Sequence, residues 1–464
     1  MKPEEVTMEK IVSLAKRRGF VFPGSEIYGG LAGTYDYGPL GSLLKKNIQE
    51  SWMNFFVTSQ GNMYLIDTPI LMHPKVWDAS GHTTEFIDPL VDDLKTNKRY
   101  RADHLLEEHG VDAEKLTVEE MNAKIKELGL KSPEGNPLSD VRKFNLMLAT
   151  KMGAVEETAL TTYLRPEEAQ SMFVNFKNVL DSVSPKIPFG IAQIGKAFRN
   201  EITPRDFIYR LREFEIMEFE YFIRPDMAWE PLFDEFLEKQ KKWLSTIGVP
   251  TDKLHALEHP DTARAHYSKK TVDLEFEYPF GTKELTGLAH RGDYDLRQHQ
   301  EFSGTSMEVL DQETNTKFIP HVLEPTVSVD RSVLAVLCSC YYEDMAGEEV
   351  RTVMKFPPSI APYKVCVSPL LKNRPELQEK ARSVFSALKK EFGHVMYDDN
   401  GNIGKRYRRQ DEIGTPFCIV IDFETLGEEK PELADTVTVR DRDTGNQERI
   451  AIQDLQKYLK EKLA

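Results

Sequence analysis

The chain of 464 residues has only four cysteines, Cys338, Cys340, Cys366 and Cys418, and none of them forms a C-x-x-C pair. This scarcity argues against a disulfide framework and against a zinc ribbon, so we expect buried free thiols and no structural zinc. The N-terminus has no apolar core of the kind found in signal peptides, and no run of ~18 apolar residues occurs anywhere in the chain. We therefore predict a cytoplasmic protein that does not span a membrane.

The familiar phosphate-binding loops are also missing. The glycines between residues 24 and 41 match neither G-x-G-x-x-G after a strand nor a P-loop that ends in G-K-[ST]. We interpret them as ordinary loop glycines. A nucleotide site in this chain must therefore be built without either loop.

The charge is unevenly distributed. The formal net charge is -15, which argues against a protein that coats nucleic acid non-specifically. From residue 363 to the end, however, 18 basic residues balance 18 acidic ones. The C-terminal part is therefore the surface that repels a polyanion least.

The length predicts two or three domains, and a proline-rich segment indicates where they divide. Residues 356–362 read F-P-P-S-I-A-P, and three prolines in seven residues suit a linker rather than a helix or a central strand. We place the linker at residues 357–362, between an N-terminal part, residues 1–356, and a C-terminal part, residues 363–464.

Periodicity indicates the fold of each part. In the C-terminal part, expected strands at 365–370, 417–422 and 435–440 are interspersed with expected helices at 376–392 and 452–463, which is typical of a small α/β domain. In the N-terminal part we expect helices at 40–56 and 167–183, a strand at 63–71, and long antiparallel strands between 189 and 323, hence an α+β core. Residues 95–164 are rich in Lys and Glu and poor in aromatics, so we predict a helical insertion there.

Arginine and glutamate gather in one expected hairpin. Arg199 and Glu201 lie two residues apart, so on a strand their side chains would share a face. The segment 199–212 holds four arginines, an unusual density in so acidic a chain. A salt-bridged strand pair is the plain interpretation. The functional one is an arginine directed at a phosphate and a glutamate directed at an amine.

Two further basic features have alternative interpretations. Arg331 lies near the expected start of a helix after Pro325, where an anion would be favoured, although it could also be a surface arginine. The run from Lys405 to Arg409 is either a solvated cluster or an RNA contact of arginines interleaved with an aromatic residue.

Five motifs stand out along the chain: Y-G-P-L-G at 37–41, W-D-A-S-G-H at 77–82, R-P-E-E-A-Q at 165–170, F-R-N-E-I at 198–202 and E-P-T-V-S-V-D-R at 324–331. Together they resemble the homodimeric type of glycyl-tRNA synthetase, a class II aminoacyl-tRNA synthetase family. They occur in the family's order across nearly the whole chain. The resemblance implies a class II antiparallel sheet flanked by helices in a catalytic domain, residues 1–356, and an anticodon-binding-like α/β domain at the C-terminus.

The resemblance also implies an activity. ATP would activate glycine to glycyl-adenylate, and the glycyl group would then pass to the 3′ end of tRNA(Gly). Mg²⁺ would accompany ATP, with Glu284 as its tentative ligand, and the chain would form a homodimer. The alternative is a synthetase-like protein without catalysis that binds RNA or a partner. Such relatives lose the ATP arginines, whereas Arg199 and Arg331 are both present here.

Residue roles follow from the same resemblance. Arg199 and Arg331 would be catalytic, at the α-phosphate and the distal phosphates, and Glu201 would bind the adenine amino group. The implied ATP-binding residues are Arg199, Asn200, Glu201, Tyr209, Arg210, Leu211, Arg212, Glu213, Phe214, Glu284, Leu285, Ser328, Val329, Asp330 and Arg331. The implied glycine-binding residues are Arg101, Glu167, Phe214, Glu215, Ile216, Met217, Glu218, Arg291, Glu324, Pro325, Thr326, Val327 and Ser328. The expected tRNA-binding residues are Lys405, Arg406, Arg408 and Arg409.

The chain departs from the family pattern at two positions. Thr326 stands where the family has serine, and Ser328 stands where it has a glycine that lets the backbone approach a ligand closely. We expect fold and class to be unaffected, and the geometry of the pocket to be the property at risk.

Overall fold

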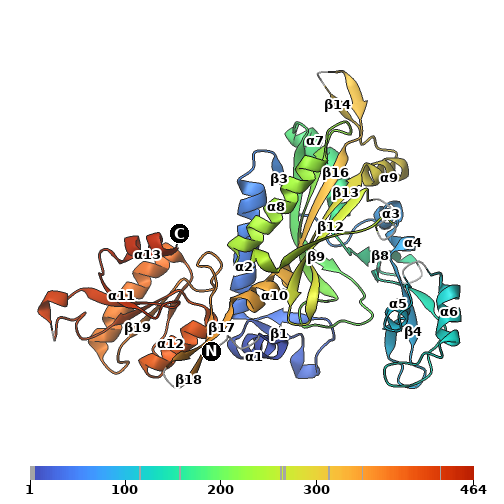
Figure 1. The fold of residues 1–464 in the computed structure, drawn as a ribbon. Helices are drawn as coiled ribbons and strands as arrows, with labels where there is room; N and C mark the ends of the chain where they lie inside the picture. Colours follow the sequence, from blue (N-terminus) through green and yellow to red (C-terminus); the bar gives the residue numbers. More distant parts are fainter. Residues whose placement is uncertain are drawn as a thin grey trace.

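The structure is a computed structural model that describes residues 6–113, 116–155, 158–261, 264, 268–311, 314–346, 349–428 and 430–463. Three parts lie side by side in Figure 1, with the C-terminal domain and the insertion on opposite sides of the catalytic domain. Among the described residues, no helix is long and apolar enough to cross a membrane.

A seven-stranded sheet forms the centre of the catalytic domain, in the order β11-β12-β13-β16-β10-β9-β3. Every neighbouring pair is antiparallel except β3 and β9. The antiparallel α+β core is therefore confirmed. Its strands are β3 (Met63–Leu65), β9 (Phe189–Phe198), β10 (Glu213–Ile223), β11 (Leu254–Glu258), β12 (Lys270–Tyr278), β13 (Gly281–Gly292) and β16 (His321–Ser328).

Helices cover both faces of this sheet. On one face, the apolar side chains of α1, α2, α8 and α10 join those of the sheet in the main hydrophobic core. On the other face, α7 and α9 pack in a smaller core around Phe222. The helices are α1 (Met8–Arg18), α2 (Pro39–Met53), α7 (Ala169–Val183), α8 (Glu230–Thr246), α9 (Tyr294–Ser303) and α10 (Val329–Cys340).

The helix predicted at 40–56 is confirmed as α2. It begins with a proline in its first turn, where a missing N–H costs little, and it buries Leu40, Leu44, Ile48 and Trp52 at helical spacing. The strand predicted at 63–71 is regular only at β3. Beyond it the chain carries Pro69, which cannot donate to a ladder, and only Leu71 makes a single bridge, to Leu164.

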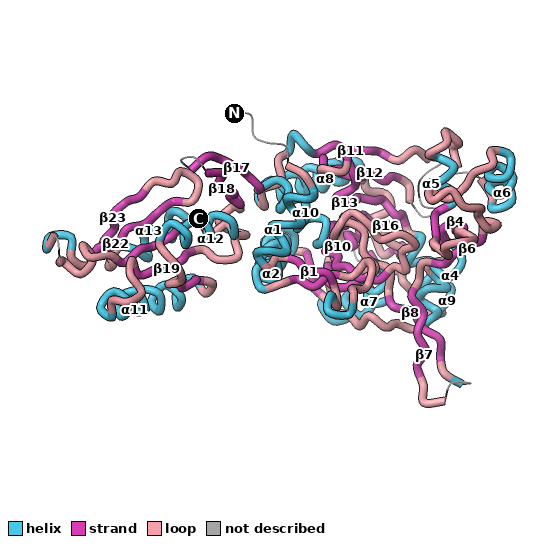
Figure 2. The backbone as a smooth tube through the Cα atoms, turned by 90° about the horizontal axis from the view of Figure 1, so that it is seen from below, coloured by secondary structure: helices cyan, strands magenta, loops and turns pink. Residues whose placement is uncertain are grey.

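The insertion is mixed rather than helical, which corrects the prediction for residues 95–164. A three-stranded sheet in the order β5-β4-β6 packs with two helices around its own small core. The strands of this region are short and largely exposed, so their polar composition hides them from a periodicity argument. The elements are β4 (Ile87–Asp92), β5 (Arg99–Arg101), α5 (Ala102–Glu107), α6 (Val118–Glu127) and β6 (Arg142–Asn145), followed by a hairpin of β7 (Leu148–Met152) and β8 (Leu160–Leu164) that projects from the molecule in Figure 2.

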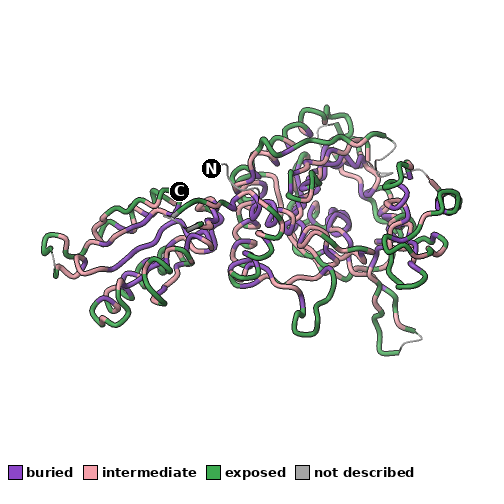
Figure 3. The backbone as a smooth tube through the Cα atoms, turned by 60° about the horizontal axis from the view of Figure 1, so that its bottom comes forward, coloured by how far each residue is buried: buried purple, intermediate pink, exposed green. Residues whose placement is uncertain are grey.

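The C-terminal domain has a five-stranded mixed sheet in the order β20-β19-β21-β22-β23, with β19 parallel to both β20 and β21. Its central strands are buried beneath helices, as Figure 3 shows. The predicted α/β domain is confirmed. Its elements are β19 (Val365–Pro369), α11 (Pro375–Phe392), β20 (Val395–Tyr397), α12 (Ile403–Ile413), β21 (Phe417–Ile421), β22 (Thr436–Asp441), β23 (Gln447–Ala451) and α13 (Leu455–Leu463).

The proline-rich segment between the two parts is packed, not free. Ile360 and Ala361 are fully buried in the main core, and the Asn47 side-chain amide donates to both of their carbonyls at 3.1 Å. A hairpin of β17 (Tyr341–Ala346) and β18 (Glu349–Met354) precedes the segment, and β18 packs against α12. The C-terminal domain is therefore docked on the catalytic domain.

The remaining elements are small. All four cysteines are free and buried, as expected. The elements are β1 (Val21–Pro23), β2 (Tyr35–Tyr37), α3 (Pro74–Ala79), α4 (His82–Glu85), β14 (Val309–Asp311), β15 (Thr316–Phe318), and the short helical turns Glu26–Tyr28, Asn54–Thr58, Thr251–Lys253 and Pro431–Leu433.

Candidate active site

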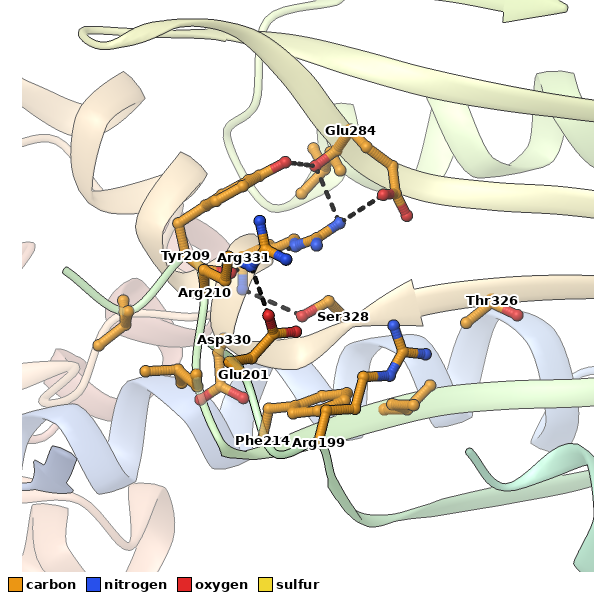
Figure 4. Close-up of a pocket in the computed structure, with 14 residues that line it drawn as sticks. Arg199, Glu201, Tyr209, Arg210, Phe214, Glu284, Thr326, Ser328, Asp330 and Arg331 are labelled. Carbon is orange, nitrogen blue, oxygen red and sulfur yellow. Dashed lines mark hydrogen bonds and ion pairs between the residues drawn. The ribbon is translucent and has the colours of Figure 1, made fainter. Parts of the chain in front are cut away.

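A pocket opens on the sheet face opposite the main core, where β9 and β10 lie beside β16 and β13. Side chains of β10 alternate, so Met217 and Phe219 enter the main core while Phe214 and Ile216 face the pocket. The pocket holds about 580 Å³ of unfilled space, part of it open to solvent. Its lining is Arg199, Glu201, Ile208, Tyr209, Arg210, Leu211, Phe214, Ile216, Glu284, Leu285, Thr326, Ser328, Asp330 and Arg331 (Figure 4).

Arg199 is held by rings and a carbonyl. Its guanidinium lies 5.4 Å from the ring centres of both Phe86 and Phe214, and its Nε donates to the Pro166 carbonyl at 3.2 Å. Among the described residues, no carboxylate forms an ion pair with Arg199. Its terminal N–H groups therefore remain available to an anion in the pocket.

Glu201 is a buried carboxylate at the same rim. It accepts from Nε of Arg210 at 2.6 Å, while its backbone carbonyl accepts from Nη2 of Arg212 at 3.0 Å. The expectation that Arg199 and Glu201 share a strand face is wrong in detail, because β9 ends at Phe198. A tight turn, in which the Glu201 N–H donates to the Arg199 carbonyl at 2.7 Å, brings both side chains to the pocket instead.

Arg331 is held by Glu284 and Tyr209 on the other side of the pocket. Its Nη1 pairs with Oε2 of Glu284 at 2.9 Å, and its guanidinium lies 4.4 Å from the ring centre of Tyr209. The Tyr209 hydroxyl donates in turn to the Glu284 carbonyl at 3.0 Å. The positive charge of Arg331 holds the pKa of the Glu284 carboxyl below its usual range. Arg331 is thus set in place before any ligand arrives.

Ser328, the residue that replaces the family's glycine, caps the helix that carries Arg331. Its Oγ accepts from the Arg331 N–H at 3.3 Å at the start of α10. Its φ of −75° is ordinary for any residue, so the backbone here does not require glycine. The next acidic residue, Asp330, accepts from the Tyr37 hydroxyl at 2.6 Å and from the Glu215 N–H at 2.8 Å, which fixes the helix start against β10.

Beyond Thr326 the site becomes buried and acidic. The Thr326 hydroxyl donates to Oε1 of Glu218 at 2.5 Å, and the other oxygen of Glu218 is buried with no hydrogen-bond partner in the part of the chain that the structure describes. Burial, and next the neighbouring charge of Glu167, raise the pKa of Glu218 to about 7. This carboxylate is therefore only partly ionised near neutral pH, and a cation beside it would favour the charged form.

Arg291 is the buried cation of this region. It is 2% exposed, makes two bonds to Asp295 at 2.8 and 2.9 Å, and donates to Glu324 at 2.6 Å. Burial nevertheless raises the pKa of Glu324 well above its ordinary value. Ligand oxygens of Glu218, Glu220 and Glu324 lie within 4.8 Å of one another, and this is the one such group among the described residues. An arrangement of this kind favours a small cation, either a metal ion or an ammonium group.

Glu167 stands at the edge of the same cluster. Burial opposes its ionisation, yet His82, Arg291 and Gln170 hold its pKa well below the ordinary range. It accepts from Gln170 at 3.0 Å, with His82 at 3.2 Å on its other oxygen. It therefore remains charged next to Glu218.

The other residues implied for the site separate into two groups. Leu211, Leu285, Ile216 and Phe214 line the pocket, as their implied roles require. Others lie elsewhere because strand alternation turns them away or because they have other partners. Val327, Val329 and Met217 are buried in the main core, and Pro325 is buried within β16. Glu213 forms an ion pair with Lys196. The backbone N–H of Asn200 donates to the Leu146 carbonyl at 2.7 Å.

Two charged residues implied for glycine also have partners outside the pocket. Glu215 pairs with Lys45 at 2.8 Å and with Gln49 at 2.6 Å. Arg101 pairs with Asp88 at 2.9 Å and with Asp103 at 2.5 Å. Neither of them lines the pocket, and their roles towards glycine stay predictions.

The expected tRNA-binding run lies on α12, and its members differ. Lys405 and Arg408 are exposed, and Arg409 pairs with Asp398 at 2.8 Å. Arg406 is only 2% exposed and donates to three backbone carbonyls, those of Pro369, Asp399 at 3.1 Å and Gly401 at 2.8 Å. Arg406 is therefore a structural residue, and its assignment to tRNA is corrected.

The sequence analysis missed the residues that hold two carboxylates of the site, those of Glu167 and Asp330, in place. Ser80 and His82 support Glu167, and Tyr37 supports Asp330. The motifs Y-G-P-L-G and W-D-A-S-G-H contain all three, so the signal was present, but their partners are distant in sequence. Only the fold brings them together.

Comparisons with known proteins agree with this geometry. The family described as "tRNA synthetase class II core domain (G, H, P, S and T)" matches residues 154–340, and the family described as "Anticodon binding domain" matches residues 364–462. The sheet, the pocket and these matches define a class II tRNA synthetase.

Curated relatives specify the family further. A glycine–tRNA ligase from Clostridium kluyveri is 48% identical over 99% of this chain and 99% of the relative. Those from Geobacillus kaustophilus, at 48% identity, and Chlorobaculum tepidum, at 47%, cover 99% and 98% of this chain and 99% and 100% of their own lengths. The chain belongs to the glycine–tRNA ligase family.

Proposed function

We propose that the pocket binds ATP and glycine together, forms glycyl-adenylate, and passes the glycyl group to the 3′ end of tRNA(Gly). The observation that carries this proposal is the continuity between two unlike ends of one site. Arg199, which has no carboxylate partner among the described residues, faces the pocket, and Thr326 connects that pocket to the buried carboxylate of Glu218. This continuity supports a phosphate site and an ammonium site side by side.

The ATP end uses the arginines in separate roles. Arg199 binds the α-phosphate, Arg331 binds the distal phosphates beside the N-terminus of α10, and Glu201 accepts from the adenine amino group. Glu284 fits a Mg²⁺ ligand, because its side chain lines the pocket and is 47% exposed, and only one of its carboxylate oxygens is paired with Arg331. When bound there, the ion would neutralise charge on the ATP phosphates.

The glycine end holds the ammonium group. Glu218 and Glu167 supply counter-charge, while Arg291 holds Glu324 beside them. A cluster of carboxylates can bind an ammonium ion without a metal ion. Binding of the cation in turn favours the ionised form of these carboxylates. Larger amino acids would be refused by collision with the walls. No smaller amino acid exists, so no editing site is required.

The reaction itself needs no nucleophilic side chain. The glycine carboxylate attacks the α-phosphorus, a new P–O bond forms, and the bond to pyrophosphate breaks, with pyrophosphate leaving. The terminal hydroxyl of tRNA then attacks the glycyl carbonyl, and AMP leaves. The protein contributes orientation and stabilisation of charge, for which Arg199 and Arg331 are suited.

The tRNA is proposed to lie along the C-terminal domain, with its acceptor end towards the insertion and the pocket. Lys405, Arg408 and Arg409 on α12 are the proposed contacts.

We also propose a homodimer in the cytoplasm. The exposed apolar residues Ile27 and Tyr28, 88% and 86% exposed, support an interface at the segment between β1 and β2. Light scattering after gel filtration measures the mass and would show a monomer if this part is wrong.

The test of the proposed function is ATP–pyrophosphate exchange, measured with each amino acid in turn. Exchange that requires glycine supports the proposal. Absence of exchange in a folded protein would favour the alternative, a synthetase-like protein without catalysis.

A further inference from the structure

A short segment made of α3, α4 and the following Phe86 contacts both ends of the site. Its residues Trp77, Ser80 and His82 are buried. The His82 imidazole lies between two rings, with its centre 5.5 Å from that of Trp77 and 5.3 Å from that of Phe86. His82 as a whole is 8% exposed. Packing therefore leaves the imidazole little freedom to turn.

Both ring nitrogens of His82 have polar partners. Nδ1 lies 2.8 Å from Oγ of Ser80, and Nε2 lies 3.2 Å from Oε2 of Glu167. The Ser80 hydroxyl has one proton to donate. It can donate either to Nδ1 of His82 or to the Trp77 carbonyl, which lies 3.3 Å away. In the first case the neutral imidazole carries its proton on Nε2. In the second case Nδ1 donates to Ser80. The first arrangement places an N–H at Nε2, 3.2 Å from Oε2 of Glu167.

Glu167 is held from two sides by this contact. His82 binds one oxygen and Gln170 binds the other at 3.0 Å, while Arg291 lies 4.0 Å from that second oxygen. Loss of the His82 contact would free one side of the carboxylate. The Oε2 oxygen would then lose its protein donor in a nearly buried setting.

The same segment reaches the ATP end. Phe86, which packs on His82, also forms one of the two ring contacts with the Arg199 guanidinium, at 5.4 Å. Phe214 forms the other ring contact, and the Pro166 carbonyl accepts from Nε. Arg199 therefore has independent support, whereas Oε2 of Glu167 has the His82 imidazole as its polar neighbour, 3.2 Å from Nε2.

We propose that His82 is a positioning residue for glycine. Its Nε2–H orients Glu167 towards the ammonium group, and Ser80 fixes the imidazole that does so. This inference rests on the proposed function, because it assigns Glu167 to glycine. It predicts a selective effect: glycine binding depends on His82, and ATP binding does not.

The test compares His82→Ala and His82→Gln in the full-length protein. The side-chain amide of glutamine can place an N–H near the position of Nε2, whereas alanine cannot. We expect His82→Ala to raise the KM for glycine in ATP–pyrophosphate exchange at least tenfold with the KM for ATP within about twofold. We expect His82→Gln to recover most of the loss. His109→Ala is the matched control, since among the described residues the His109 side chain bonds to the Leu105 carbonyl within the insertion, and the variant should behave as the original chain.

The glycine-dependent rise in the melting temperature gives a second readout that needs no catalysis. The glycine concentration that gives half of this rise should increase for His82→Ala and return for His82→Gln. If the original chain shows this rise but no exchange, the proposed function fails while the role of His82 is still tested.

Two results would overturn the inference. One is an equal rise in both KM values for a folded His82→Ala protein. The other is a His82→Gln protein as impaired as His82→Ala. If His82→Ala does not fold, Ser80→Ala decides the matter: a selective loss of glycine affinity supports the proposal, and an unchanged glycine KM contradicts it.

Discussion

Thr326 on β16 donates its hydroxyl to Glu218 on β10, with 2.5 Å between the two oxygens, directly across the two central strands. The register pairs these two residues as neighbours, so the contact follows from the sheet and needs no loop to position it. It is also the point at which the open pocket meets the buried carboxylates.

Replacing Thr326 by Val should therefore weaken glycine binding. Valine has nearly the same shape, but it leaves both oxygens of Glu218 without a donor. Because a hydrogen bond to a charged group contributes ~1.5–3 kcal/mol, we expect the KM for glycine to rise about tenfold or more. Steady-state exchange kinetics measure this. Thr326→Ser keeps the hydroxyl and is the control, and equal behaviour of the two variants would contradict the assigned role.

The ionisation of Glu218 predicts a pH dependence. Burial raises its pKa to about 7, so the carboxylate is increasingly protonated below that pH and loses its attraction for ammonium. With a pKa of about 7, the ionised fraction falls from about one half at pH 7 to about one tenth at pH 6, so we expect the KM for glycine to increase about fivefold. Titration of ATP phosphates would instead change the KM for ATP, which serves as the internal control.

The same raised pKa affects stability with a definite sign. The folded state holds a proton on Glu218 that the unfolded state releases near its ordinary value of 4.5. This group's contribution to stability is therefore present at low pH and declines as the pH rises through about 7.

In Glu218→Gln, the glycine KM should be high at every pH and no longer depend on this titration. A pH profile unchanged from the original would show that another group is responsible.

Arg199 is predicted to act on the α-phosphate. Arg199→Ala should reduce the exchange rate by about 10²–10³, which corresponds to ~2.7–4 kcal/mol of transition-state stabilisation. Arg205→Ala, in the same loop, is the control, because the Arg205 side chain is 53% exposed and does not line the pocket. Near-normal exchange in folded Arg199→Ala would remove the residue from this role.

Ser328→Gly tests the departure from the family pattern. The serine caps α10, and replacement of a capping serine by glycine typically costs only a few tenths of a kcal/mol. We expect unchanged or improved exchange activity with a slightly lower melting temperature. Ser328→Ala, which also loses the cap, should be destabilised by ~1 kcal/mol. A marked loss of activity in the glycine variant would show that the serine is an adapted part of this site.

The surface of α12 predicts how tRNA binds. Replacing exposed Lys405 and Arg408 by alanine should weaken tRNA binding and reduce the slope of log K against log[salt] by about 0.7–0.9 for each lost phosphate contact. Filter binding at several salt concentrations measures both quantities. An unchanged affinity and slope would return these residues to the solvated-surface interpretation.

Arg406→Ala should behave differently from that surface pair. Three backbone carbonyls lose a buried donor, so we expect the free energy of unfolding of the C-terminal domain to fall by about 2 kcal/mol or more. Thermal unfolding separates this effect from a loss of RNA contacts. An Arg406→Ala protein of unchanged stability would contradict the structural role.

The sequence predicted elements best where one periodicity dominated. The apolar stripe of α2 and the long strands on either side of segment 199–212 were clear, because burial on one face fixes the pattern. The insertion was misread since its strands are short and polar. Arg406 was misread because a basic run does not show which side of a helix is buried.

For the site, order along the chain identified Arg199, Glu201, Glu284 and Arg331, and all four line one pocket. What the sequence could not provide was the pairing of distant residues. The support of Glu167 by His82 and of Asp330 by Tyr37 depends on how separate segments meet across the fold. The capping role of Ser328 likewise required the observed start of α10.

The most direct test of the whole account is ATP–pyrophosphate exchange by the full-length chain, with glycine, alanine and serine compared under identical conditions. The account predicts exchange with glycine and a rate at least 10²-fold lower with the other two, because their side chains collide with the walls around Glu218. Exchange of similar rate with alanine or serine, or no exchange with glycine by a folded protein, would contradict it.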